Sequence, residues 1–237
     1  SAALPFVRYV QMMGGNYSAL MKDRQIIAFF GTIFALVFIT FVTLLWIFPH
    51  HPEQAMREAL FNITSIISGT GYSSVDYMQW GSFLIAMFFF VGLIGGCAGS
   101  TACSIKIFRY QLLFASISTQ LRRIRSPSGV FTPRYAGAPI TPEVMSSVMS
   151  FFVFFVVSMG ILSVGLSLTG LDFITSISGA ATALANVGPG LGSEIGPAGN
   201  FAGLGDAAKW MLSFAMLVGR LELLAVYAIF TIRFWRA

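Results

Sequence analysis

The stretch Gly69-Thr70-Gly71-Tyr72-Ser73 lies between two apolar segments and decides the fold. It follows a moderately apolar segment of 14 residues, 55–68, and precedes 29 residues without charge, 77–105. A helix needs about 20 apolar residues to cross a bilayer, so the shorter segment is typical of a re-entrant or buried helix. Non-helical backbone persists at membrane depth only inside protein or beside water, which predicts that this loop lines a cavity.

The composition around this stretch is that of an integral membrane protein. The 237 residues are 56% hydrophobic and 10% charged, whereas soluble domains carry about 25% charged residues. The net charge of +5 is too small for a phosphate-tracking patch, so no nucleic-acid partner is expected. The two cysteines, Cys97 and Cys103, are predicted to be buried free thiols. Four segments with little or no charge are predicted spans: 26–48, 77–105, 144–171 and 210–232.

The distribution of charge predicts the orientation. Residues 1–25, 106–143 and 233–237 hold 11 basic and two acidic side chains, and the opposite side holds two basic and six acidic ones. By the positive-inside rule the basic side is cytoplasmic, which puts both ends of the chain in the cytoplasm.

The same order of segments occurs twice. A second short segment, 176–185, precedes the loop Asn186-Val187-Gly188-Pro189-Gly190. A shift of 117 residues aligns Gly71 with Gly188, and after an insertion of ten residues the shift becomes 127. Any two apolar segments can be aligned by chance, but the recurrence of short helix and glycine loop in the same order favours an internal repeat.

The predicted fold is therefore an all-α polytopic membrane protein with two repeats of outer helix, short pore helix, filter loop and inner helix. In cation channels this plan lets loop carbonyls replace the hydration shell of the ion. The first repeat is predicted at residues 26–125, with a broken inner helix, and the second at residues 144–237. Cytoplasmic linkers are predicted at residues 1–25, an amphipathic segment, and 126–143.

The residues of these loops and inner helices resemble a known family. Four stretches carry the resemblance in combination: Thr70-Gly71-Tyr72, residues 186–190, Gly219-Arg220-Leu221-Glu222, and residues 95–101 followed by Lys106. Together they are similar to the Trk/Ktr/HKT superfamily of potassium transporters, and most similar to the C-terminal half of bacterial TrkH/TrkG subunits. The resemblance implies an ion-conducting subunit for potassium uptake across the bacterial inner membrane. Family members have four repeats around one pore, so this chain is expected to be repeats three and four of a longer polypeptide.

The resemblance also implies partners and ion ligands. The expected partners are the lipid bilayer, the missing two N-terminal repeats, a second copy in a homodimer, and a cytosolic nucleotide-binding subunit that is TrkA-like or KtrA-like. No organic cofactor is expected, and whether transport is a symport stays open. Potassium is expected to meet the carbonyls of Thr70, Gly71, Val187 and Gly188, with Tyr72 and Pro189 completing the filter loops.

The break in the first inner helix allows two interpretations. Glycine costs about 1 kcal/mol relative to alanine in a helix, and the family has a gating loop here, which is expected to comprise Gly95, Gly96, Gly99, Ser100 and Lys106. The alternative is a close helix–helix contact through small residues. Lys106 either caps the loop or anchors at the cytoplasmic interface.

Arg220 is the most unusual single residue of the predicted spans. It lies ten residues past Trp210, about 15 Å into the span, where an unpaired arginine costs at least roughly 2.5–3.5 kcal/mol. The resemblance places it in the pore as a cation barrier. An ion pair with Glu222 is the alternative, although residues two apart point to different helix faces. Glu222 is expected to accept hydrogen bonds from buried backbone or the gating loop.

The sequence also allows two other functions and contains one basic surface segment. A degenerate pore half acting as a non-conducting scaffold is one alternative. Gly203-Leu204-Gly205-Asp206 matches an intramembrane aspartyl protease motif, but a second membrane aspartate to share the proton is lacking, so no enzyme is expected. The basic stretch Arg122-Arg123-Ile124-Arg125 is predicted to contact either anionic lipid or a soluble partner.

Overall fold

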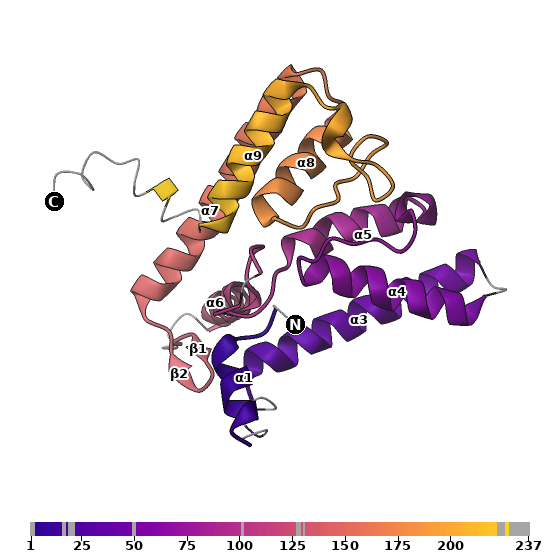
Figure 1. The fold of residues 1–237 in the computed structure, drawn as a ribbon. Helices are drawn as coiled ribbons and strands as arrows, with labels where there is room; N and C mark the ends of the chain where they lie inside the picture. The colour runs from indigo at the N-terminus through magenta and orange to yellow at the C-terminus, as the bar shows by residue number, and fades with distance from the viewer. Residues whose placement is uncertain are drawn as a thin grey trace.

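The computed structural model describes residues 3–15, 18, 22–48, 51–100, 102–126, 129, 131–221 and 226–227. The described part is mostly helical, with one short β-hairpin. Figure 1 shows two groups of helices, α3–α5 and α7–α9, which meet where α5 packs against α8.

The first group begins with the amphipathic helix α1 (Phe6–Met13) and the long apolar helix α3 (Arg24–Ile47). The Asp23 carboxylate caps α3 by accepting a hydrogen bond from the Gln25 amide at 3.0 Å. The short helix α4 (Pro52–Ile67) returns along α3, and it begins with a proline and has Glu53 in its first turn, both favourable at a helix start. The 3₁₀ turn η1 (Tyr77–Trp80) and helix α5 (Ser82–Leu93) follow.

The second group has the same order. The long apolar helix α7 (Pro142–Leu168) leads to the short helix α8 (Phe173–Ala185), which Asp172 caps. Asn186 ends α8 in the left-handed conformation with φ of 53°, a conformation in which asparagine is one of the few favoured residues. The 3₁₀ turn η2 (Phe201–Gly203) and helix α9 (Asp206–Arg220) complete the group.

Helix α6 (Ile107–Arg125) and a hairpin of β1 (Arg134–Tyr135) with β2 (Ala138–Pro139) connect the two groups. The hairpin turns at Ala136 and Gly137, both with positive φ. Helix α6 was not predicted. It packs against α3 and α7, and its last turn carries Arg122, Arg123 and Arg125, where positive charge complements the helix dipole.

Residues 77–105, the predicted span for which a broken inner helix was expected, do not form one continuous helix. Their described part contains η1 and the 12-residue helix α5. We call residues 94–106, between α5 and α6, the interhelical loop; its described residues, 94–100 and 102–106, are not helical. Within the described residues, two helices are long and apolar enough to cross a membrane, α3 and α7, while α5 and α8 are apolar but shorter. Part of the fourth predicted span, including residues 222–225 and 228–232, lies outside the described residues.

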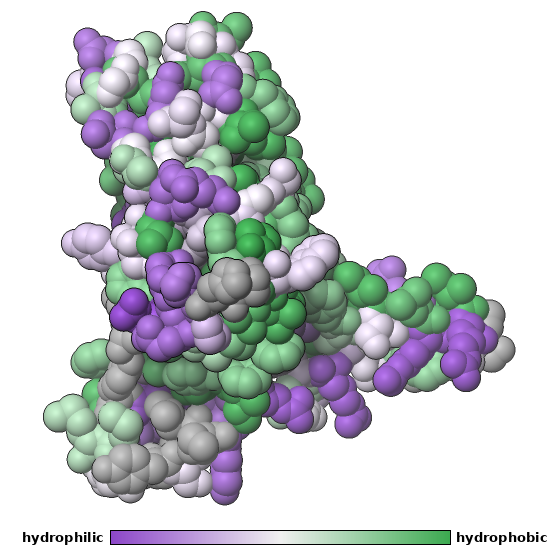
Figure 2. All heavy atoms as spheres, turned by 90° about the vertical axis from the view of Figure 1, so that its right-hand side faces the viewer, coloured by the Kyte–Doolittle hydropathy of each residue, from purple (hydrophilic) through white to green (hydrophobic). Residues whose placement is uncertain are grey.

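Two clusters of buried apolar side chains hold the groups together. The first includes Leu44, Ile63 and Tyr77, whose ring stacks on Phe88 at 4.5 Å between centroids. Large apolar side chains are also exposed on α3, α7 and α9, among them Phe34, Trp46, Ile161, Leu168 and Trp210. Figure 2 shows continuous hydrophobic areas on one face beside smaller hydrophilic patches. Exposed apolar surface of this extent is typical of a protein that faces lipid or another subunit.

Candidate functional site

Two glycine loops leave the C-terminal ends of the two short helices. The first glycine loop, residues 69–73, follows α4, and the second, residues 186–190, follows α8. The C-terminal end of a helix carries partial negative charge, which favours a cation nearby. The predicted filter residues are all uncharged, and Thr70, Tyr72 and Gly188 are exposed on the surface of this chain.

The backbone of both loops is fixed by the same pattern of hydrogen bonds. The amides of Thr70 and Gly71 donate to the Ser65 carbonyl at 2.9 and 3.3 Å. The amide of Val187 donates to the Thr182 carbonyl at 3.2 Å, and that of Gly188 to the Thr182 hydroxyl at 3.1 Å. Donors and acceptors in one loop are each 117 positions from their counterparts in the other. In a trans peptide the amide and carbonyl point in opposite directions, so the carbonyls of Thr70 and Val187 point away from their own helices.

The two glycine loops also touch each other. Gly71 and Gly188 have φ of +78° and +120°, a region that L side chains rarely adopt. A β-carbon on Gly71 would collide with the Val187 carbonyl oxygen and lie 3.2 Å from the Pro189 ring. A β-carbon on Gly188 would lie 3.6 Å from the Gly71 α-carbon. The loops from the two groups of helices therefore meet at these glycines.

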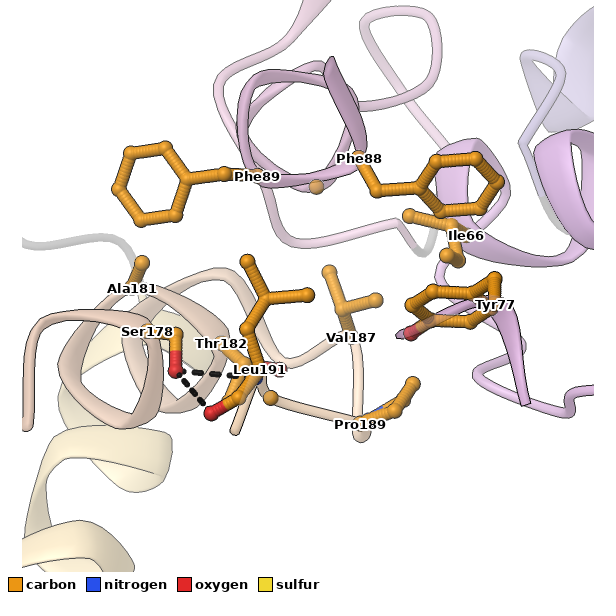
Figure 3. A pocket seen from close by; sticks show the side chains of 12 residues that line it. Ile66, Tyr77, Phe88, Phe89, Ser178, Ala181, Thr182, Val187, Pro189 and Leu191 are labelled. Carbon is orange, nitrogen blue, oxygen red and sulfur yellow. Dashed lines mark hydrogen bonds between the residues drawn. The ribbon is translucent and has the colours of Figure 1, made fainter. Parts of the chain in front are cut away.

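A buried polar side chain of each short helix binds the residue that directly follows a glycine loop. Asn62 is fully buried, donates to Ser74 Oγ at 2.8 Å and accepts from the Ser74 amide at 3.0 Å. Ser178 makes two 2.9 Å hydrogen bonds, one to the amide and one to the carbonyl of Leu191 (Figure 3). Sequence reasoning missed both residues, although a polar side chain inside a short buried helix was a usable signal.

Apolar side chains of α5 cover the back of the second glycine loop. Figure 3 shows a pocket with Phe88 and Phe89 of α5 on one side and Val187 and Leu191 on the other, and the Phe88 ring lies over Tyr77. Tyr77 closes the pocket beside Pro189. The side chains of α5 therefore form an apolar layer between its backbone and the second glycine loop.

The interhelical loop folds back so that its two ends pair. The Gly95 amide donates to the Ile105 carbonyl at 2.9 Å, and the Ile105 amide to the Leu93 carbonyl at 3.1 Å. A β-carbon on Gly95 would lie 2.8 Å from the Ser104 carbonyl oxygen, so the pairing needs glycine there. Among the other predicted gating residues, Gly99 has φ of +73°, and Ser100 Oγ donates to the Cys97 carbonyl at 2.6 Å. Lys106 directly precedes α6.

The interhelical loop contacts the end of α8 next to the second glycine loop. Ser104, which is buried, lies with its hydroxyl 3.1 Å from the Ala185 carbonyl and 3.1 Å from that of Gly92. Asn186 donates to the Met216 carbonyl of α9 at 2.9 Å. A β-carbon on Gly219 would collide with the Leu184 carbonyl, so α9 also approaches the end of α8 closely.

Arg220 is the last residue of α9 and reaches the interhelical loop. Its Nη1 lies 2.9 Å from Cys103 Sγ, and the side chain is exposed. Cys103 is only partly buried, which corrects the prediction of two buried thiols, while Cys97 is buried and both thiols are free. Glu222, the predicted alternative partner of Arg220, lies outside the described residues. Arg220 thus reaches the part of the interhelical loop, Cys103 and Ser104, that contacts the end of α8.

The long apolar helices and the exposed apolar surface are typical of the class of mostly helical membrane proteins. The family model "TrkH: Cation transport protein" matches residues 25–235, and the chain belongs to this family. The resemblance noted in the sequence is thereby confirmed, as is the expectation of a transport protein rather than an enzyme.

Relatives and a solved structure agree with this family. The Trk system potassium uptake protein TrkI of Halomonas elongata is 44% identical over 99% of this chain and 47% of its own length. TrkH of Escherichia coli strain K12 is 30% identical over 95% of this chain and 46% of its own length. The crystal structure of the potassium transporter TrkH from Vibrio parahaemolyticus matches with a TM-score of 0.90 and 32% identity, over 99% of this chain and 50% of that one. The chain spans about half the length of the curated relatives it matches.

Proposed function

We propose that this chain supplies half of a potassium-conducting pore for uptake across the bacterial inner membrane. The observation that carries the proposal is the meeting of Gly71 with Val187 and Gly188, in loops whose amides are tied back to their own helices in the same pattern. Two of four filter strands would then lie side by side. Relatives named for potassium uptake support potassium as the transported ion.

In this proposal the ion meets backbone carbonyls in a filter with a single glycine per repeat. The amides of Thr70, Gly71, Val187 and Gly188 are used within the chain, which leaves their carbonyls as candidate ligands. Both glycines have positive φ, which lets neighbouring carbonyls point in directions that other residues rarely allow. The C-terminal dipoles of α4 and α8 add negative potential at the same place.

The interhelical loop acts as the gate in this proposal, and Arg220 as the positive charge beside it. Their contact through Cys103, next to the end of α8, supports a position just below the filter. Glu222 is proposed to accept hydrogen bonds from this region. Lys106, at the junction of loop and α6, is proposed to fix the loop or to anchor at the cytoplasmic interface.

The pore role also implies an arrangement of repeats, an orientation and partners. The two repeats, residues 26–125 and 144–237, would be the third and fourth around the pore, with both chain ends and the linkers 1–25 and 126–143 in the cytoplasm. Two further repeats, a second copy and a cytosolic nucleotide-binding subunit would complete the transporter. The basic end of α6 is proposed to face lipid headgroups or that subunit.

The test is ion flux through the complete transporter in proteoliposomes. We expect potassium-dependent flux in the wild type and altered ion preference when Gly71 and Gly188 are each replaced by serine. Gly160→Ala is the matched control, because Gly160 lies in α7 with nothing within 4 Å of an added β-carbon. Absence of potassium flux through a correctly folded wild-type protein would favour the non-conducting scaffold instead.

A further inference from the structure

The tip of the interhelical loop is held by the N-terminal segment, residues 3–15 and 22–25. The Cys97 amide donates to the Ala3 carbonyl at 2.8 Å, and the Phe6 amide donates to the Gly99 carbonyl at 3.4 Å. A β-carbon on Gly96 would lie 2.6 Å from the Ala3 carbonyl oxygen. Ala3 itself is fully buried. The two backbones are therefore packed together.

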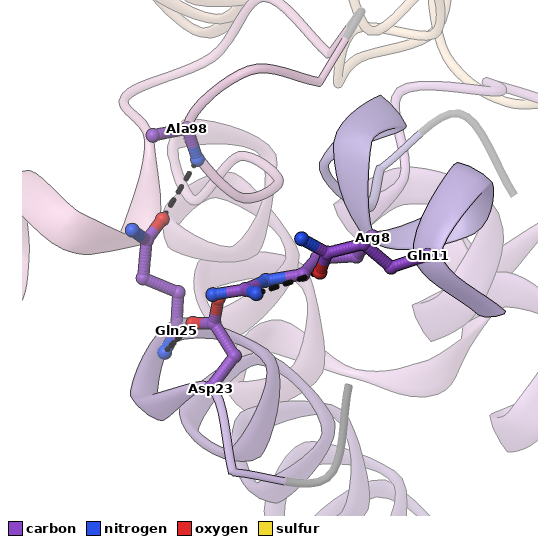
Figure 4. Close-up of polar contacts among 5 residues, drawn as sticks. All are labelled: Arg8, Gln11, Asp23, Gln25 and Ala98. Carbon is purple, nitrogen blue, oxygen red and sulfur yellow. Dashed lines mark hydrogen bonds and ion pairs between the residues drawn. The ribbon is translucent and has the colours of Figure 1, made fainter. Parts of the chain in front are cut away.

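Gln25 makes the side-chain contact to the same tip. Its Oε1 accepts a hydrogen bond from the Ala98 amide at 2.8 Å (Figure 4). Asp23, which caps the helix that carries Gln25, also accepts from Arg8 Nε at 2.9 Å. Arg8 in turn donates to Gln11 at 2.9 Å. This polar chain fixes α1 against the start of α3, and so fixes Gln25 where it meets the loop.

A second set of contacts ties the same helix start to α6, the helix that follows the loop. Gln111 of α6 donates to the Arg24 carbonyl at 3.1 Å and accepts from the Tyr135 hydroxyl at 2.9 Å. Burial, and next the charge of Asp23, raises the pKa of Tyr135, so its hydroxyl keeps the proton that it donates. The start of α3 is thus joined to the loop tip, to α6 and to the β-hairpin.

We propose that the N-terminal segment is a latch that sets the position of the interhelical loop, with Gln25 and the Arg8–Asp23 ion pair as positioning residues. The loop cannot move away from the N-terminal segment without breaking the hydrogen bonds of the Cys97 and Ala98 amides. Displacing the N-terminal segment from the cytoplasmic side would release the tip. The consequence for ion flux rests on the proposed function, in which this loop is the gate.

The test compares Gln25→Leu, which removes the acceptor, with Gln25→Glu, which keeps one. The rate at which a water-soluble alkylating reagent modifies Cys97 in the complete transporter, measured by peptide mass spectrometry, reports loop position, because Cys97 is buried at the tip. We expect Gln25→Leu to raise this rate roughly tenfold, the factor for one buried hydrogen bond, and Gln25→Glu to stay within about twofold of wild type. Gln120→Leu is the control, because Gln120 is an exposed glutamine on α6.

Flux measured on the same samples separates the latch from the gate. Faster alkylation with higher potassium flux supports both. Faster alkylation with unchanged flux supports the latch and overturns the gating role of the loop. An alkylation rate in Gln25→Leu equal to that of wild type overturns the latch, whatever the flux. If Gln25→Leu folds poorly, the same alkylation rate is measured in Asp23→Asn and Arg8→Gln, singly and together. Both substitutions remove the ion pair, and the asparagine side chain still caps the helix.

Discussion

Ser104 lies with its hydroxyl 3.1 Å from the carbonyl oxygen of Ala185, 81 positions further along the chain. This contact joins the interhelical loop of the first group to the end of the short helix of the second. The carbonyls in the last turn of a helix have no partner within it, so Ala185 needs one from elsewhere. A single side chain therefore connects the interhelical loop, the proposed gate, to the helix that carries the second glycine loop, part of the proposed filter.

We predict that Ser104→Ala loosens the interhelical loop. The change leaves the Ala185 carbonyl without this donor, which costs about 1 kcal/mol or more, and a change of about 1.36 kcal/mol is tenfold in rate. Amide hydrogen exchange in residues 94–106 should quicken by roughly fivefold to tenfold, and potassium flux should rise. Ser118→Ala, at an exposed position of α6, is the control. Unchanged exchange would show that the contact does not hold the loop.

The glycines of the two loops are predicted to differ in their tolerance of a side chain. Gly71→Ser should lower the yield of folded protein more than Gly188→Ser, because its β-carbon would collide with the Val187 carbonyl whereas that of Gly188 would have 3.6 Å of space. Strained positive φ adds about 1–3 kcal/mol to either change. Both should reduce the permeability ratio of potassium to sodium. Identical ratios in wild type and both variants would remove these loops from the filter.

Removing the tip of the interhelical loop, residues 97–100, is predicted to raise flux. The deletion spares the pairing of Gly95 and Ile105 that joins the loop ends, so α5 and α6 keep their connection. Flux is to be compared with wild type per folded molecule, after size-exclusion chromatography. A folded deletion variant with unaltered or lower flux would favour the alternative that these glycines serve helix packing only.

The sequence predicted the elements that follow from apolar length and glycine spacing. Short helices were expected at residues 55–68 and 176–185, and α4 and α8 occupy residues 52–67 and 173–185. The first three residues of α4, Pro52, Glu53 and Gln54, were missed because they lie outside the apolar run. Those of α8, residues 173–175, were missed because the prediction took only the stretch of small residues, 176–185. Helix α6 was missed because the three arginines of its last turn suggested only a cytoplasmic segment.

The site could be predicted only where its residues are close in sequence. The glycine loops were found because the sequence shows the same local pattern twice, a short apolar segment followed by a glycine loop. The contacts of Ser104 with Ala185, and of Ala98 with Gln25, join residues 81 and 73 positions apart. Nothing in a single sequence marks such pairs, because serine and glutamine are mostly exposed in proteins and the few that are buried have no local signature.

Arg220 is predicted to slow cation passage by its charge. Two unit charges repel by about 4 kcal/mol at 4 Å in an effective dielectric of 20, and a third of that is about tenfold in rate. Arg220→Ala should therefore speed potassium flux by roughly tenfold, and Arg220→Lys far less because it keeps the charge.

The contact of Arg220 with Cys103 offers a second explanation, in which the arginine holds the loop. Cys103→Ala separates the two, because it removes the sulfur and leaves the charge. We expect less than a twofold change in flux from Cys103→Ala in purified proteoliposomes, corrected for folded protein. A gain as large as that of Arg220→Ala would assign the effect to the contact, and flux in Arg220→Ala at or below wild type would defeat the barrier role.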